Sequence, residues 1–317
     1  MRFSVGPASS SGAPGVEVSQ LDIGDLADAG VRGALLDLWI DSGVVVFRGM
    51  DGGMDAHLAL SRCFGELRHH PVRESWVEGH PELIHVGHRP EEGDVYEVDG
   101  EQRGAWLPWH SDLIYVDKIN RGGILRPIEL PDSGGQTGFI DKSATYNRLP
   151  RKLQQQIEDL HVVYHFNLNA EEQKFGRTPG IRKLKDSSAY LALRARISDF
   201  PMSIHPMVYR QPQTGRMVLN VSPWFSQGIH EMPGPDGDAL LSEVVEYCTD
   251  ERYAYFHEWR LDDLVLWDNW RMLHCARGCP WQLTRLMQRT TFVGDYALGA
   301  LAKSTPAQHA NLPTVDV

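Results

Sequence analysis

The sequence has no long hydrophobic run and little cysteine. No stretch of about 18 consecutive apolar residues occurs, which argues against a membrane-spanning helix and a membrane partner. The first residues form a small-residue tract with no apolar segment behind it, so we expect no secretory signal. Only four cysteines occur, without the paired spacing of a zinc site, and nothing in their number favours an oxidising compartment. We therefore expect a cytoplasmic protein.

The sequence also lacks the excess of basic residues that nucleic-acid binding requires. It has 31 lysines and arginines against 42 aspartates and glutamates, a formal net charge of −11. Because lysine and arginine neutralise the phosphate backbone, this balance argues against nucleic acid as a partner. It does not exclude a small anionic ligand, since a local pair of arginines is enough to bind one. We expect a small-molecule substrate.

The order of expected elements indicates a mostly β protein with inserted helices. Helical spacing of apolar residues predicts helices at 27–39, 57–64, 152–160 and 238–248. Runs of β-branched and apolar residues predict strands at 43–47, 83–86, 122–130, 207–209, 217–220, 263–267 and 290–293. A double-stranded β-helix core (jelly-roll or cupin-like) with inserted helices fits this pattern best. Because β-barrels of this size commonly form one unit, we expect a single domain over 1–317.

The residues most suggestive of chemistry are Trp109-His110-Ser111-Asp112. On a strand, side chains two apart point to the same face, so His110 and Asp112 can offer a nitrogen and an oxygen to one metal. The leading third ligand is His274, which follows an apolar strand far along the chain. Two histidines and one carboxylate leave three positions open, as in non-haem Fe(II) oxygenases. Zinc could use the same residues, although less characteristically.

Two arginines follow His274 at an interval that suits one face of a strand. Arg285 and Arg289 would share that face, with Met287 between them. A guanidinium suits a carboxylate, and a buried arginine is costly without an anion to pair with. One arginine for the distal carboxylate of 2-oxoglutarate and the other for a substrate anion would meet that need. The alternative is two arginines that face solvent on an edge strand.

These elements together resemble the taurine dioxygenase (TauD/TfdA) family. The resemblance rests on His110-x-Asp112, His274 and Arg285, and it covers roughly residues 15–297. Further matching segments are Phe64-Gly-Glu-Leu67, His69-His70-Pro71, Leu130-Pro-Asp-Ser-Gly-Gly-Gln-Thr137, His205-Pro206 and Trp267-Asp268-Asn269. The combination is far more specific than any one part.

The resemblance implies an oxygenase that uses Fe(II), 2-oxoglutarate and O₂ and releases succinate and CO₂. By position, His110, Asp112 and His274 would bind Fe(II). Arg285 would form a salt bridge with the distal carboxylate of 2-oxoglutarate, and Thr137 would hydrogen-bond to the same group. Since halogenating relatives lack the carboxylate ligand, Asp112 favours hydroxylation, desaturation, epoxidation or ring formation.

The resemblance also implies four substrate-binding residues. The positions of His70 and Arg289 face the anionic end of the substrate in relatives that act on a sulfonate, and Phe225 matches an aromatic residue of that pocket. Trp106 stands near the place of an asparagine in taurine dioxygenase, so a bulky indole replaces a small amide. We therefore expect a larger, partly apolar and anionic substrate, such as a natural-product intermediate. Relatives are commonly dimers or tetramers, and self-association is expected.

Two other functions stay open at this point. A metal-dependent hydrolase or isomerase could use zinc on the same three residues, but it leaves Arg285 and Thr137 unexplained. A non-catalytic binding protein is disfavoured, because buried polar groups without ligands are costly. Metal content and dependence on 2-oxoglutarate separate these alternatives. The polar insertion at 183–186 is a candidate lid over the site.

Overall fold

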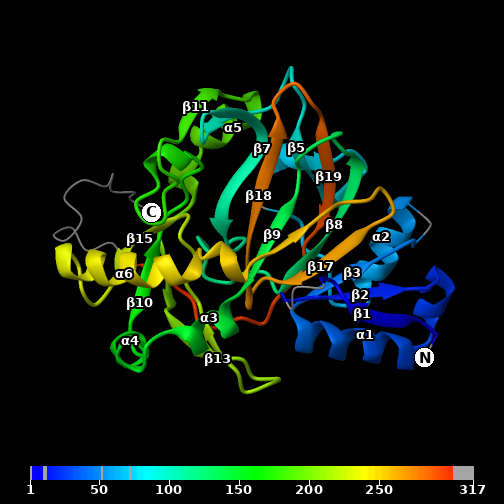
Figure 1. The fold of residues 1–317 in the computed structure, drawn as a ribbon, viewed down its shortest axis with the longest axis horizontal. Coiled ribbons are helices and arrows are strands. Elements are labelled where there is room, and N and C mark those ends of the chain that lie inside the picture. Colours follow the sequence, from blue (N-terminus) through cyan, green and yellow to red (C-terminus); the bar gives the residue numbers. More distant parts are fainter. Residues whose placement is uncertain (1, 10–12, 51–52, 71–72, 303–317) are drawn as a thin grey trace.

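A computed structural model describes residues 2–9, 13–50, 53–70 and 73–302 of the protein. It confirms a mostly β architecture with inserted helices (Figure 1). The α-helices are α1 (Ala29–Ser42), α2 (Gly53–Arg62), α3 (Lys142–Arg148), α4 (Arg151–Ile157), α5 (Ser188–Arg194) and α6 (Pro235–Cys248). Among the described residues, no helix combines the length and apolar character needed to cross a membrane.

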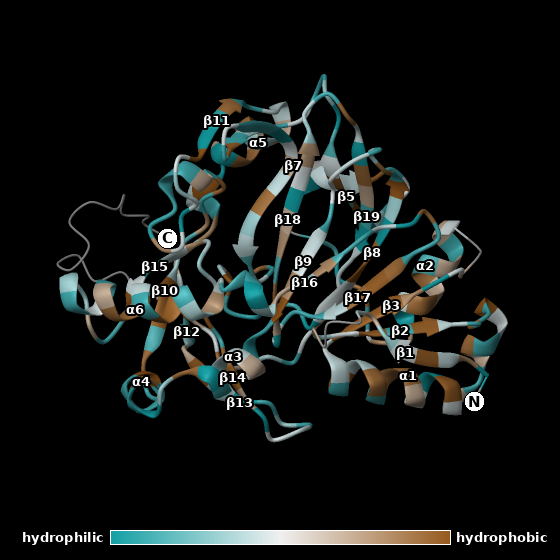
Figure 2. Ribbon diagram, in the orientation of Figure 1, coloured by the Kyte–Doolittle hydropathy of each residue, from teal (hydrophilic) through white to brown (hydrophobic). Residues whose placement is uncertain are grey.

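The largest sheet has eight strands and is antiparallel except where β2 pairs with β3. In spatial order its strands are β1 (Ser4–Pro7), β2 (Val16–Ser19), β3 (Val44–Phe47), β17 (Leu264–Asp268), β8 (Gly122–Glu129), β19 (Arg285–Thr290), β5 (His80–His88) and β4 (Trp76–Val77). Helices α1 and α2 cover one face, where Leu35 and Leu60 pack in a cluster with Phe47, Ile124 and Leu266. Strands β3 and β17 are largely hydrophobic, as expected for buried strands (Figure 2).

A six-stranded antiparallel sheet packs against the other face. Its order is β11 (Arg182–Lys185), β6 (Val95–Val98), β7 (Glu101–His110), β18 (Met272–Pro280), β9 (Thr137–Asp141) and β16 (Tyr255–His257). One core cluster joins the two sheets, because it combines Val46, Val265 and Met287 of the first with Phe139 and Met272 of the second. The two sheets therefore form a sandwich with a shared apolar interior.

The rest of the described chain forms a separate layer beside the sandwich. A four-stranded sheet has the order β15 (Ser226–Ile229), β10 (His161–Tyr164), β12 (Ser203–Pro206) and β20 (Ala300–Leu301). The strands expected at 207–209 and 217–220 are confirmed with shifted ends as β13 (Val208–Arg210) and β14 (Met217–Leu219), which pair as an antiparallel hairpin. The largest core cluster joins this layer to α3, α4 and α6, and it includes Trp109 and Leu273 next to the candidate metal ligands.

Most expected helices and strands are confirmed with shifted ends. Asp28 caps α1 by accepting hydrogen bonds from the amides of Gly30 and Val31, and Gly43 ends it with φ 78°. The helix expected at 27–39 therefore begins and ends later. The strand expected at 290–293 is wrong beyond its first residue, because β19 runs from Arg285 to Thr290. β19 is also the strand expected to carry Arg285 and Arg289, and both arginines are buried rather than exposed to solvent.

Candidate metal centre

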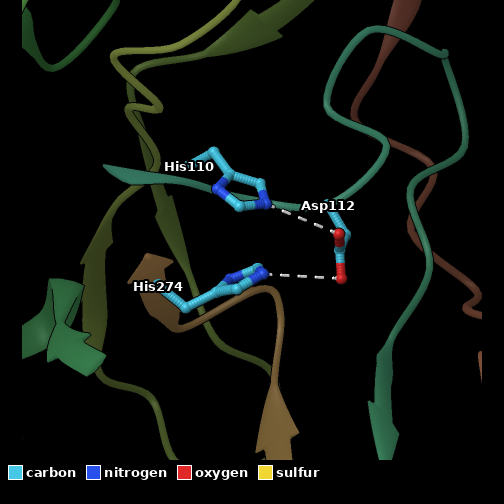
Figure 3. A group of neighbouring side chains, drawn as sticks. All are labelled: His110, Asp112 and His274. Atoms are coloured by element: carbon cyan, nitrogen blue, oxygen red, sulfur yellow. Dashed lines mark ion pairs between the residues drawn. The ribbon is translucent and has the colours of Figure 1, made fainter. Parts of the chain in front are cut away.

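His274 lies far along the chain from His110 and Asp112, but the fold brings the three side chains together. His110 is the last residue of β7, and His274 on β18 is its cross-strand partner. The His110 Nε2 atom lies 3.8 Å from Asp112 Oδ1, and the His274 Nε2 atom lies 3.7 Å from Asp112 Oδ2 (Figure 3). One donor atom from each residue lies within 4.8 Å of the other two, and all three residues are buried. The predicted three residues are thus brought to one point.

His110 and Asp112 lie close together, but they do not share the face of a strand as expected. Strand β7 ends at His110, so Asp112 lies in a turn and not on the same strand face. The turn is held by side chains from elsewhere: the Asp112 amide donates to Asn269 Oδ1 (2.7 Å), and Asn269 Nδ2 donates to the Asp112 carbonyl (2.9 Å). The Ser111 amide donates to Ser222 Oγ (3.0 Å). Side-chain hydrogen bonds therefore replace the strand ladder at this ligand.

The protonation states suit a divalent metal. His110 Nδ1 lies 2.8 Å from the Pro108 carbonyl, so Nδ1 carries the proton and Nε2 keeps its lone pair toward Asp112. Burial lowers the pKa of His110, and burial together with His110 lowers the pKa of His274 well below its ordinary value. Burial alone would raise the pKa of Asp112, but Arg289 and the two histidines lower it further than burial raises it. Two neutral imidazoles therefore face a carboxylate.

An unpaired oxygen supports a metal at this point. Asp112 Oδ2 is buried and has no hydrogen-bond partner among the described residues. A buried carboxylate oxygen left unpaired is costly, and a bound cation would satisfy it. Two histidine nitrogens and one carboxylate oxygen are the donor set of non-haem Fe(II) sites. The residues present therefore fit Fe(II).

Arg285 is the second unusual group of this region. Its side chain is only 1% exposed, Nε donates to the Gly135 carbonyl (2.8 Å) and Nη2 donates to Thr137 Oγ1 (3.1 Å). No carboxylate pairs with it in the part of the chain that the structure describes. Burial lowers the pKa of Arg285 to about 10. A buried cation without a counter-charge is costly, so Arg285 is arranged for an anion that the protein does not supply.

Two cavities meet beside these residues. The smaller, of about 50 Å³, is lined by both histidine ligands, by Thr137, Arg285 and Arg289, and by apolar residues that include Phe139 and Trp267. The larger, of about 630 Å³, is lined on its apolar side by Trp106, Leu107, Leu168, Leu193 and Trp224. Both cavities are bordered by Val86, Leu107, Ala276 and Arg285. The two candidate histidine ligands and Arg285 thus share a small cavity that adjoins a much larger one.

The four predicted substrate residues lie in different places. Trp106 lines the large cavity and packs on Tyr96, with ring centroids 5.4 Å apart. Arg289 lines the small cavity, where Nη1 donates to Asp112 Oδ1 (2.7 Å). His70 is half-buried and is not among the residues that line either cavity, while Pro71 beside it lies outside the described residues.

Phe225 is not among the residues that line either cavity, whereas its neighbour Trp224 lines the large one. The Phe225 backbone has φ 75°, and its ring packs in the core against Tyr115 at 5.0 Å. Its other face stacks on Trp224 at 4.3 Å. Trp224 in turn meets His110 edge-on at 5.2 Å.

Several residues that the structure brings to the site carry no signal of their own in the sequence. Asn269 belongs to a matching motif and Ser222 to none, yet both hold the Ser111–Asp112 turn. Tyr190 and Leu193 of α5 line the large cavity, next to the insertion considered as a lid. No local signal marks these residues, because each acts through a partner distant in the sequence.

Comparisons with known proteins agree with this geometry. Residues 6–291 match the family described as "Taurine catabolism dioxygenase TauD, TfdA family". The chain is 29% identical over 265 residues to an alpha-ketoglutarate-dependent 2,4-dichlorophenoxyacetate dioxygenase of Cupriavidus pinatubonensis, covering 80% of this chain and 86% of that protein. It is 25% identical over 258 residues to pentalenolactone F synthase of Streptomyces avermitilis, covering 80% and 82% respectively.

A solved structure shows the same fold over almost the whole chain. A taurine dioxygenase from Burkholderia xenovorans superposes with a TM-score of 0.73 at 24% identity, covering 98% of each chain. Because the family match spans most of the sequence and the predicted ligands converge, the identification no longer depends on motif spacing alone. The chain belongs to the TauD/TfdA family of Fe(II)- and 2-oxoglutarate-dependent dioxygenases.

Proposed function

We propose that this Fe(II)- and 2-oxoglutarate-dependent dioxygenase oxidises a small organic acid that has a bulky apolar body. The observation that carries the proposal is the large aromatic cavity, about 630 Å³ in volume, that meets the ligand cavity at Arg285. A volume in this range suits a ring-bearing small molecule. The relatives include enzymes named for a dichlorophenoxyacetate and for pentalenolactone F, both larger than taurine.

In this proposal His110, Asp112 and His274 hold Fe(II). Bound Fe(II) supplies O₂ activation, coupled to the conversion of 2-oxoglutarate to succinate and CO₂. Arg285 and Thr137 bind the distal carboxylate of 2-oxoglutarate, because they face the same small cavity as the histidines and Arg285 lacks an anion. The co-substrate therefore neutralises the buried guanidinium when it binds.

The walls of the two cavities position the substrate and exclude water. Trp224 packs against the edge of His110, so it separates the ligand from bulk solvent on that side. Trp106 and Tyr96 form an aromatic wall farther out, against which an apolar ring would pack. Holding the substrate close to the metal in a dry cavity is the main contribution that the protein makes to the reaction.

Arg289 is the proposed contact for the anionic end of the substrate. Its Nη1 donates to Asp112, but its Nε is buried without a hydrogen-bond partner among the described residues. This free donor supports an anion contact near the metal rather than in the large cavity. His70 remains a proposed contact only if the substrate reaches beyond the residues that line the large cavity.

The broader architecture is proposed in the same way. The two packed sheets support a double-stranded β-helix of the jelly-roll type as the core that carries the site. We infer one domain over 1–317 and self-association as a dimer or tetramer, as for the family.

The test is a turnover screen with a matched set of substrates. Succinate formation from 2-oxoglutarate would be measured under air with aryloxy acids, alicyclic acids, their neutral amides and taurine. We expect ring-bearing acids to stimulate succinate formation and to be oxidised, with amides and taurine far weaker. Stimulation by the amides equal to that by the acids would overturn the proposed anionic end, and preference for taurine would overturn the proposed apolar body.

A further inference from the structure

A buried lysine contacts the turn that joins two of the metal ligands. Lys142 is the first residue of α3, and its side chain is only 1% exposed. Its amine donates to Ser111 Oγ over 3.0 Å. Ser111 itself stands between His110 and Asp112 in the sequence and is fully buried. The amine is therefore one hydrogen bond away from the residue that spaces two of the ligands.

Lys142 is not explained as a member of an ion pair. The two nearest acidic residues have other partners, since Asp141 pairs with Arg271 (2.6 Å) and Asp268 pairs with Arg121 (3.2 Å). No carboxylate lies within ion-pair distance of the Lys142 amine among the described residues. A buried amine with one neutral acceptor costs stability compared with an apolar side chain of similar length. Its presence is therefore better explained by what it does to Ser111.

The turn needs such support, because it lies beyond the strand ladder. Three backbone groups of the turn are already held, the Ser111 amide by Ser222, and the Asp112 amide and carbonyl by Asn269. These contacts fix the main chain on two sides. The Lys142 amine holds the Ser111 hydroxyl by a further hydrogen bond. With these contacts made, the spacing of the two ligands is set from three separate elements.

We propose that Lys142 is a positioning residue that acts through Ser111 to hold the His110–Asp112 turn and so raises the affinity of the site for a divalent metal. The inference rests on the proposed metal site. Neither Lys142 nor Ser111 is a ligand in that site, and neither lines the two cavities. Replacing either residue should therefore change the affinity for the metal more than the affinity for substrate or 2-oxoglutarate.

The test measures metal binding to the apoprotein, without turnover. Mn(II) affinity would be determined by isothermal titration for the wild type, Lys142→Met, Ser111→Ala and the double variant. Loss of a hydrogen bond that orients a metal ligand typically weakens metal binding by about tenfold or more. We expect that loss in each single variant, and no further loss in the double variant, because both changes remove the same contact.

A matched control comes from another buried lysine. Lys183 on β11 is paired with Asp94 (3.2 Å) and Asp186 (3.1 Å), away from the candidate ligands. Lys183→Met should leave the Mn(II) dissociation constant within twofold of the wild type. The melting temperature of each apoprotein shows whether the variant is folded, and Lys142→Met should melt at the wild-type temperature or above it.

The outcomes separate this inference from the function on which it rests. Wild-type Mn(II) affinity in both single variants, or additive losses in the double variant, would overturn the role of Lys142 through Ser111 while leaving the metal site intact. If Lys142→Met does not fold, a wild-type Mn(II) affinity in Ser111→Ala is enough to overturn the role of Lys142 through Ser111. Failure of the wild type to bind Mn(II) would instead count against the proposed metal site.

Discussion

Replacing Arg285 with methionine should weaken 2-oxoglutarate binding and leave the ligand-free protein at least as stable. The two effects have opposite signs because the guanidinium is buried without a counter-charge. Burial lowers its pKa from 12.5 to about 10. That difference corresponds to roughly 3 kcal/mol of lost stability for the charged form. Removing the charge recovers this energy, less about 1–2 kcal/mol for the hydrogen bonds to Gly135 and Thr137.

The loss of binding follows from the same contact. Two hydrogen bonds from a guanidinium to a carboxylate contribute about 3 kcal/mol or more together. The dissociation constant for 2-oxoglutarate should therefore rise at least about a hundredfold in Arg285→Met. Thr137 keeps its hydrogen bond from the Trp259 indole, so the cavity wall stays in place.

The assay combines chemical unfolding with ligand-induced stabilisation. Urea unfolding without 2-oxoglutarate gives the intrinsic change, and the rise in melting temperature with added Mn(II) and 2-oxoglutarate reports binding. Arg126→Met is the matched control, because Arg126 on neighbouring β8 is half-buried, donates to Gln288 (2.8 Å) and lines neither cavity. A strongly destabilised Arg285→Met that still binds 2-oxoglutarate normally would refute the reasoning.

Three further predictions concern the pH dependence of stability and the large cavity. Burial lowers the pKa of His57 to about 3 and that of His205 to about 4, so both stay neutral in the folded protein. The free energy of unfolding should therefore fall by up to about 1.4 kcal/mol per pH unit for each histidine as the pH is lowered from 6 to 4.5. Urea unfolding should show a weaker pH dependence of stability for His57→Gln than for the wild type, and an equal dependence would contradict this. Burial lowers the pKa of Lys142 to about 8, so the unfolded chain binds more protons than the folded protein between pH 8 and 10.5. Across that window the free energy of unfolding of the wild type should rise relative to that of Lys142→Met by up to about 3 kcal/mol. An equal pH dependence of stability in the two proteins would contradict this. Trp106→Ala should raise KM for a ring-bearing substrate by roughly tenfold and leave 2-oxoglutarate affinity unchanged, and an unchanged KM would remove Trp106 from the substrate wall.

The candidate ligands could be predicted from the sequence because their residue types are rare in that combination. His110, Asp112, His274 and Arg285 were identified by chemistry and spacing, and the structure brings them around one small cavity and the adjoining turn. The pattern said nothing of which strands pair, but antiparallel pairing of β7 with β18 places the two histidines opposite each other. That register depends on long-range packing rather than on either segment alone.

The other features of the site could not be predicted from the sequence, because they depend on backbone angles and on contacts between residues far apart in the sequence. Trp224 rather than Phe225 lines the large cavity, and Phe225 has φ 75°, which a non-glycine residue seldom adopts and no local motif predicts. Lys142 looks like an ordinary exposed lysine at the start of a helix until its burial beneath Ser111 is known. The ion pair of Arg289 with Asp112 likewise joins two segments that only the fold brings together.

The most direct test of the central claim is an anaerobic titration of the apoprotein with Fe(II) and then with 2-oxoglutarate, repeated for His274→Ala. The account predicts a weak visible charge-transfer band in the wild type that appears only when both are present and is absent without His274. A folded wild-type protein that gives no such band and binds zinc in preference would contradict the account and favour a zinc-dependent hydrolase.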